Sequence, residues 1–161
     1  MTFPALLLVL FASVAPESRT DWMQPSRLGI SIGMPRQEVE SILKQSKKEI
    51  LPGKVPEHLV VELSEKKSVT LAFEEDRLQS ARFELVEFPR EIAAAFSEVE
   101  RRLANAHGKP TDRKQRPSVL VYDGTDPRIY VVASTDPRTG FGKQGVGFLV
   151  VRYFAPPPAT I

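Results

Sequence analysis

The residues of this chain that could carry out chemistry are few and widely spaced. The two histidines, His58 and His107, lack the spacing of metal ligands. His107 falls near the end of an expected helix, where the helix dipole favours a positively charged side chain. A Ser-His-acid site could assemble only from distant positions. There is no cysteine, which excludes disulfide bonds, thiolate catalysis and cysteine-bound metal.

Residues 140–145 match the pattern G-x-G-x-x-G of dinucleotide-binding proteins. That function requires a strand before the glycines and a helix after them, whereas a strand follows here. The pattern is therefore interpreted as a hairpin loop, whose backbone amides could bind an anion or a segment of a partner. Phe141 and Lys143 in this loop are candidate partner-binding residues.

Other charged clusters indicate no cofactor. Lys109, Arg113, Lys114 and Arg116 form the densest basic patch, which favours a solvated loop over a phosphate or nucleic-acid site. The carboxylates at positions 74–76 leave a weak Ca²⁺ site open as an alternative, but they lack the spacing of an EF-hand. We therefore predict no catalytic, cofactor-binding or metal-binding residue, and no nucleic-acid partner.

The first 15 residues indicate export. An apolar run at positions 3–14 is shorter than the ~20 residues that span a bilayer, and Ser13 and Ala15 are the small residues expected just before a cleavage site. This pattern predicts a signal peptide or an N-terminal anchor, although no Lys or Arg precedes the run and Pro16 follows it. A buried N-terminal strand or helix is the alternative. We expect a periplasmic or secreted protein whose only membrane contact is this segment, if it stays uncleaved.

Apolar periodicity predicts two helices and six strands. One helix opens at Pro35, and a second runs from Pro89 to the cap candidate Gly108, with apolar residues at alternating steps of four and three. Alternating residues predict strands at 58–63, 68–73 and 78–85, and then at 118–122, 129–134 and 147–154.

This order predicts an α+β fold of tandem helix-βββ units (α-βββ-α-βββ), in which antiparallel sheets pack against two helices. We expect residues 16–27 to be a linker, with Trp22 folding back onto the domain. Residues 28–154 would form one domain of two repeats, 28–88 and 89–154, followed by a Pro-rich tail at 155–161.

The two halves differ in their strand patterns. Strands of the first half alternate apolar and polar residues, whereas those of the second half are apolar on both faces. All three tyrosines, Tyr122, Tyr130 and Tyr153, lie in the second set. Tyrosine suits an interface because it combines a large apolar body with a polar tip. One face must cover the second helix, and the other either packs on the first half or meets a partner, so the tyrosines are candidate partner-binding residues.

The stretch Leu28–Leu43 resembles the small outer-membrane assembly lipoproteins of the BamE/SmpA type and the related fold of β-lactamase inhibitor protein. Ile32-Gly33-Met34, Glu38-Val39 and Leu43 carry the likeness, as do residues 73–78 and Gly108-Lys109-Pro110. The resemblance implies a small exported α+β module that has no cofactor and works by protein–protein contact. The chain departs from that group in lacking the lipid-bearing cysteine and in placing three strands between its helices.

We therefore expect an exported, non-enzymatic module of the bacterial envelope. It would bind another envelope or secreted protein through a sheet face or through the 135–147 loop. The alternative is a small periplasmic hydrolase or ligand-binding protein with a pocket between the sheets.

Overall fold

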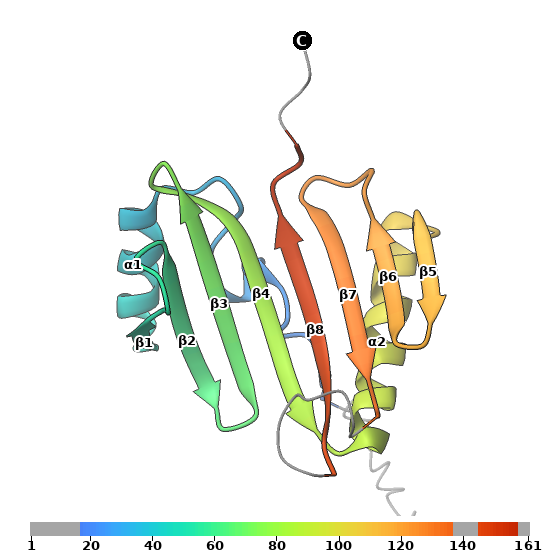
Figure 1. Ribbon diagram of the computed structural model, residues 1–161. Coiled ribbons are helices and arrows are strands. Elements are labelled where there is room, and N and C mark those ends of the chain that lie inside the picture. The colour runs from blue at the N-terminus through green and yellow to red at the C-terminus, as the bar shows by residue number, and fades with distance from the viewer. Residues whose placement is uncertain (1–16, 137–144, 158–161) are drawn as a thin grey trace, which may run out of the picture.

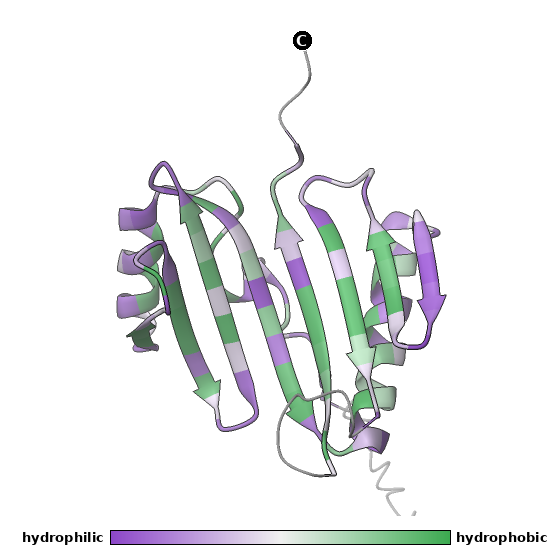
Figure 2. Cartoon of the chain, viewed as in Figure 1, coloured by the Kyte–Doolittle hydropathy of each residue, from purple (hydrophilic) through white to green (hydrophobic). Residues whose placement is uncertain are grey.

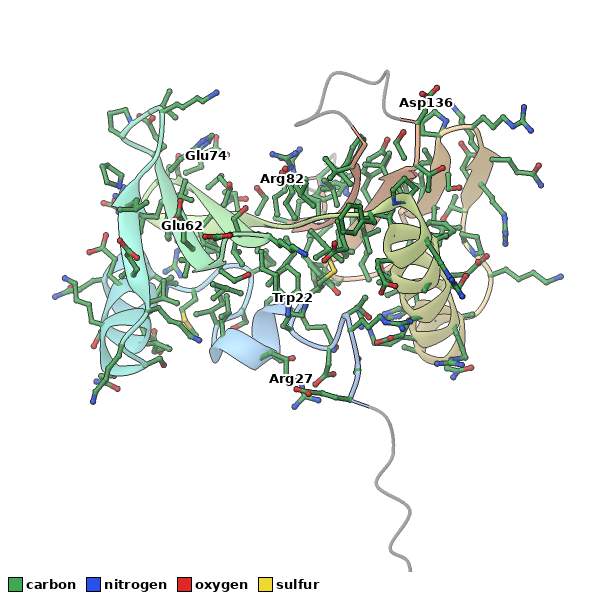
Figure 3. The ribbon with its side chains drawn as sticks, turned by 90° about the horizontal axis from the view of Figure 1, so that it is seen from below. Trp22, Arg27, Glu62, Glu74, Arg82 and Asp136 are labelled. Atoms are coloured by element: carbon green, nitrogen blue, oxygen red, sulfur yellow. The ribbon has the colours of Figure 1, made fainter. Side chains whose placement is uncertain are left out.

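The structure, a computed structural model, describes residues 17–136 and 145–157. Its strands form one eight-stranded antiparallel sheet in the order β1-β2-β3-β4-β8-β7-β6-β5 (Figure 1). Both helices lie on the same side of this sheet (Figure 3). The strands are β1 Glu49–Pro52, β2 His58–Ser64, β3 Lys67–Glu74, β4 Arg77–Glu87, β5 Asp112–Gln115, β6 Ser118–Tyr122, β7 Arg128–Ser134 and β8 Gly147–Phe154.

The two helices, α1 (Arg36–Gln45) and α2 (Pro89–His107), begin where the sequence predicts them. Each presents an apolar stripe to the sheet, because residues three and four apart share one helix face. In α2 this stripe is fully or almost fully buried, and it consists of Ile92, Ala95, Val99 and Leu103. Gly108 ends α2 with φ at 75°, a left-handed conformation that glycine adopts without strain. The core therefore lies between the helices and one face of the sheet.

The prediction of tandem helix-βββ units with separate sheets is wrong. Each helix is followed by four strands, and all eight strands belong to a single sheet. The joining contact is the pairing of β4 with β8, in register from Ser80 opposite Phe154 to Glu87 opposite Gly147. Such a pairing satisfies the backbone groups of two strands that would otherwise be exposed sheet edges. The two halves consequently meet edge to edge, and among the described residues no strand face packs on another.

The stretch before α1 is anchored to the β3–β4 hairpin. Gly33 donates its backbone N–H to the carbonyl of Leu78 over 2.7 Å, and Leu78 donates to Met34 over 2.9 Å. The hairpin turns through Glu75 and Asp76, both with positive φ, as a tight two-residue turn requires. Gly33 itself has φ at 91°, a conformation that a side chain would strain. This turn therefore fixes the direction in which α1 crosses the sheet.

Residues 17–28, which include most of the linker expected at 16–27, lie between the two helices on their side of the sheet (Figure 3). Met23 is fully buried there, and the hydroxyl of Tyr153 donates a hydrogen bond to its carbonyl over 3.1 Å. Trp22 folds back as expected, with its ring edge-on to Phe83 at 6.1 Å between centroids. A short 3₁₀ helix, Pro25–Leu28, ends the segment. We call residues 17–28 the N-terminal strap.

Glu98 of α2 holds the start of the strap. Its carboxylate accepts hydrogen bonds from the hydroxyls of Ser18 and Thr20 and from the backbone N–H groups of Arg19 and Thr20. Arg102, one turn along the helix, donates to the carbonyl and hydroxyl oxygens of Thr20 over 3.0 Å each. Burial alone would raise the pKa of Glu98, but the donors outweigh it and hold that pKa below its ordinary value of 4.5.

A lowered folded-state pKa stabilises the protein above the unfolded-state pKa, and the contribution is lost as the pH falls through the folded-state value. Glu98→Gln should therefore lower the free energy of unfolding by about 1 kcal/mol at pH 7. This difference from wild type should shrink as the pH falls below the ordinary value of 4.5. Urea unfolding between pH 7 and pH 3 measures it.

Glu91→Gln is the matched control, because the one ion pair of Glu91 within residues 17–136 and 145–157 is an exposed one, with Arg19 at 3.5 Å. It should change the stability little at any pH. A Glu98→Gln difference that stays constant down to pH 3 would contradict the account.

Candidate functional site

The side of the sheet away from the helices is the candidate functional surface, which we call the uncovered face. No helix or strand among the described residues packs on it, whereas Trp22 and Arg27 lie on the opposite side (Figure 3). Strand registers place its side chains in three parallel rows that cross the sheet, because alternate residues share one face. These rows bring together residues from both halves of the chain.

The central row contains two arginines directly opposite each other. Arg82 of β4 pairs with Arg152 of β8, so their Cβ atoms are about 4.5–5.5 Å apart. Tyr130 of β7 lies beside Arg152, and Thr70 of β3 lies beside Arg82. We call this the arginine row; in strand order from β6 to β1 it consists of Val121, Tyr130, Arg152, Arg82, Thr70, Val60 and Leu51.

A second row adds another arginine and an aromatic ring. The guanidinium carbon of Arg128 lies 4.3 Å from the ring centroid of Phe154, and that of Arg152 lies 5.4 Å from it. Both distances are within the range of cation–π attraction. We call this the histidine row; it consists of Arg128, Phe154, Ser80, Ala72 and His58.

The third row, which we call the valine row, changes character along its length. From β5 to β1 it consists of Lys114, Val119, Val132, Val150, Glu84, Ser68, Glu62 and Glu49. It is apolar on the second half and acidic on the first, and Glu84 forms an ion pair with Arg82 at 2.9 Å. Figure 2 shows mostly hydrophobic residues along β6 and β7, and hydrophilic residues alternating with hydrophobic ones along β4.

The structure separates the three candidate tyrosines. Tyr122 and Tyr153 face the helices and are 3% and 7% exposed, respectively, so their side chains belong to the core. Burial raises the pKa of both hydroxyls. Only Tyr130 reaches the uncovered face, where it is 37% exposed. Phe141 and Lys143 lie outside the described residues, as does most of the 135–147 loop.

No Ser-His-acid site forms among the described residues. His58 lies on the uncovered face, whereas the ring of His107 packs 5.9 Å from that of Tyr122 on the opposite side. Residues Gly29–Gly33 match G-x-S-x-G, the pattern that holds the nucleophilic serine of many hydrolases. In the described part of the chain, however, neither histidine forms a hydrogen bond with Ser31 of this pattern. A pocket between two sheets is wrong as well, because the chain forms a single sheet.

Within residues 17–136 and 145–157, no group of three His, Asp or Glu side chains is arranged to hold a metal ion. The turn carboxylates of Glu74, Glu75 and Asp76 are all exposed. Neither helix in the same residues is both long and apolar enough to cross a membrane.

Sequence reasoning missed Arg82, Arg128 and Arg152 as candidate site residues. They lie in three different strands, far apart in the sequence, so no local cluster marked them. One sequence feature could have indicated such a residue, namely a lone arginine in an otherwise apolar strand. Arg152, between Val151 and Tyr153, is the example. Its significance depends on the pairing of β4 with β8, which no local pattern specifies.

Comparison with known proteins adds no identity, since no family model, no curated protein and no solved structure matches this chain.

Proposed function

We propose that this chain is an exported, non-enzymatic protein-binding module of the bacterial envelope, and that it binds its partner through the uncovered face. The observation that carries the proposal is the exposed Tyr130, which stands between Val121 and Arg152 in the arginine row of a face without a helical layer. The apolar run at positions 3–14 and the resemblance to the BamE/SmpA-type lipoproteins support the envelope location.

The chemistry of the surface defines the partner. Val121 and Val132 are partly accessible beside Tyr130, and three arginines border them along β4, β7 and β8. Interface cores favour aromatic residues and arginine, with a few such residues dominating the binding energy. The partner is therefore a protein that presents apolar side chains ringed by carboxylates. Because the carboxylates would pair with exposed arginines, binding should weaken as salt increases.

Tyr130→Ser should weaken binding to the partner by about thirtyfold, the effect of losing an aromatic hot spot of about 2 kcal/mol. The full-length chain would first capture candidate partners from an envelope extract. Each purified candidate would then be titrated against wild type and variant by calorimetry.

Phe88→Ser is the matched control, because Phe88 is an exposed aromatic residue (61%) that lies outside the uncovered face, next to α2. It should bind like wild type. Equal affinity of Tyr130→Ser and wild type, with both folded, would show that the uncovered face is not the interface.

A further inference from the structure

A cavity of about 300 Å³ opens on the uncovered face, over β2, β3, β4 and β8. That volume is at the lower end of the range for small-molecule sites, about 300–1,000 Å³. The arginine row and the histidine row supply most of its lining, and the turn after β1 closes one side. The lining residues are Gly53, Lys54, His58, Val60, Thr70, Ala72, Ser80, Arg82 and Arg152.

The lining is strongly basic. Lys54, Arg82 and Arg152 contribute three positive charges, and the lining contains no carboxylate. Arg82 is neutralised by Glu84, which lies in the neighbouring row. Within the described part of the chain, Lys54 and Arg152 form no ion pair. The cavity therefore carries a net charge of about +2, without counting His58.

Arg82 pairs with Glu84 and Arg152 contacts the Phe154 ring, but these contacts leave two cations directly opposite each other in the sheet. Like charges directly opposite in a sheet are destabilising, and Arg82 and Arg152 are such a pair. Sites where a chain breaks its own folding rules are commonly functional. An anionic ligand bound between the two guanidinium groups would attract both of them and so offset their mutual repulsion.

The polar groups of the lining suit an acceptor with several oxygens. Guanidinium and ammonium groups only donate, and the hydroxyls of Thr70 and Ser80 are free to donate too. Neither hydroxyl hydrogen-bonds to another side chain or backbone group among the described residues. A phosphate group carries about −1.5 to −2 charges at pH 7 and offers three acceptor oxygens, so it matches both the charge and the donors. A single carboxylate would leave one cation uncompensated.

The rest of the cavity accommodates an organic body. Val60 and Ala72 give an apolar surface between the cations, and the cavity is larger than a phosphate ion alone. Gly53 allows His58 to approach closely, since a Cβ on Gly53 would lie only 2.4 Å from the His58 Cβ. We propose that this cavity binds a phosphate monoester, with Arg82 and Arg152 clamping the phosphate group. The cavity would bind this ligand in the absence of any protein partner.

Calorimetric titration of the full-length chain with phenyl phosphate tests the proposal. Inorganic phosphate tests the phosphate group without an organic body. Benzoate tests the same aromatic body with a carboxylate in place of the phosphate group. Phenyl phosphate should bind most tightly. Arg152→Gln and Arg82→Gln should each weaken its binding by at least about tenfold, as expected for a lost charge-assisted hydrogen bond. Thr70→Val should weaken it by a smaller factor.

Arg90→Gln removes the same charge from the exposed start of α2 and should leave the affinity unchanged. The melting temperature of Arg152→Gln should stay close to that of wild type, because relief of the like-charge pair offsets loss of the contact with the Phe154 ring. Failure of phenyl phosphate to bind, equal binding of benzoate or of inorganic phosphate, or unchanged affinity in Arg152→Gln would each overturn the proposal.

Discussion

Replacement of Phe83 by alanine should lower the free energy of unfolding by about 3–5 kcal/mol, the usual effect of removing a buried aromatic ring. Phe83 is fully buried on β4, at the centre of the sheet. Its ring is edge-on to Trp22 of the N-terminal strap at 6.1 Å and to Tyr153 of β8 at 5.9 Å. The substitution therefore removes contacts between three parts of the chain and leaves a cavity where they meet. Denaturant-induced unfolding measures the loss.

Phe88→Ala provides the control, since it deletes the same ring from a side chain that is 61% exposed. It should change the free energy of unfolding by less than about 1 kcal/mol, because an exposed ring buries little surface. Similar losses in the two variants would contradict the central position of Phe83. A loss below about 1 kcal/mol for Phe83→Ala would do the same.

Local patterns predicted the elements of this fold well and their assembly poorly. The α2 stripe and the alternating strands were visible because periodicity reports which face of an element is buried. The short edge strands β1 and β5 were missed. Glu49–Pro52 has four residues and ends in proline, and Asp112–Gln115 is exposed at every position. Charge and proline are the features by which edge strands avoid unwanted pairing, and they also hide such strands from pattern analysis.

The single sheet escaped prediction for a different reason. Alternation shows that Phe83 and Val151 each face a core, but it does not show that they pair with each other. That pairing depends on backbone hydrogen bonds between distant strands, which leave no local trace. The apolar second face of β6–β8 was correctly seen to be unusual, yet its neighbours could be named only after the strand order was known.

The candidate site follows from the same long-range pairing. Register between β4 and β8 places Arg82 against Arg152, and register between β7 and β8 places Tyr130 beside them. The surface proposed to bind a protein and the cavity proposed to bind an anion therefore share the arginine row, and Arg152 belongs to both. Ligand in the cavity would neutralise the arginines that attract a carboxylate-bearing partner, so the two proposed events should compete.

Replacement of Met23 by alanine should lower the free energy of unfolding by about 2–5 kcal/mol, the usual range for a large aliphatic core residue. Met23 is fully buried although it belongs to a polar segment without periodicity. Its carbonyl accepts a hydrogen bond from Tyr153, so the strap is attached to the sheet as well as to α2 through Glu98. Thermal and denaturant unfolding of the full-length variant would measure the change.

Met34→Ala is the matched control, because Met34 packs against the same core but is only partly buried. Its loss should be clearly smaller, since the cost of truncation rises with the cavity left behind. If Met23→Ala and wild type were equally stable, the strap would be a dispensable linker. A large loss confined to Met23→Ala would instead make residues 17–28 an integral layer of the fold, one that fills the space between α1 and α2 and leaves the opposite face of the sheet free for binding.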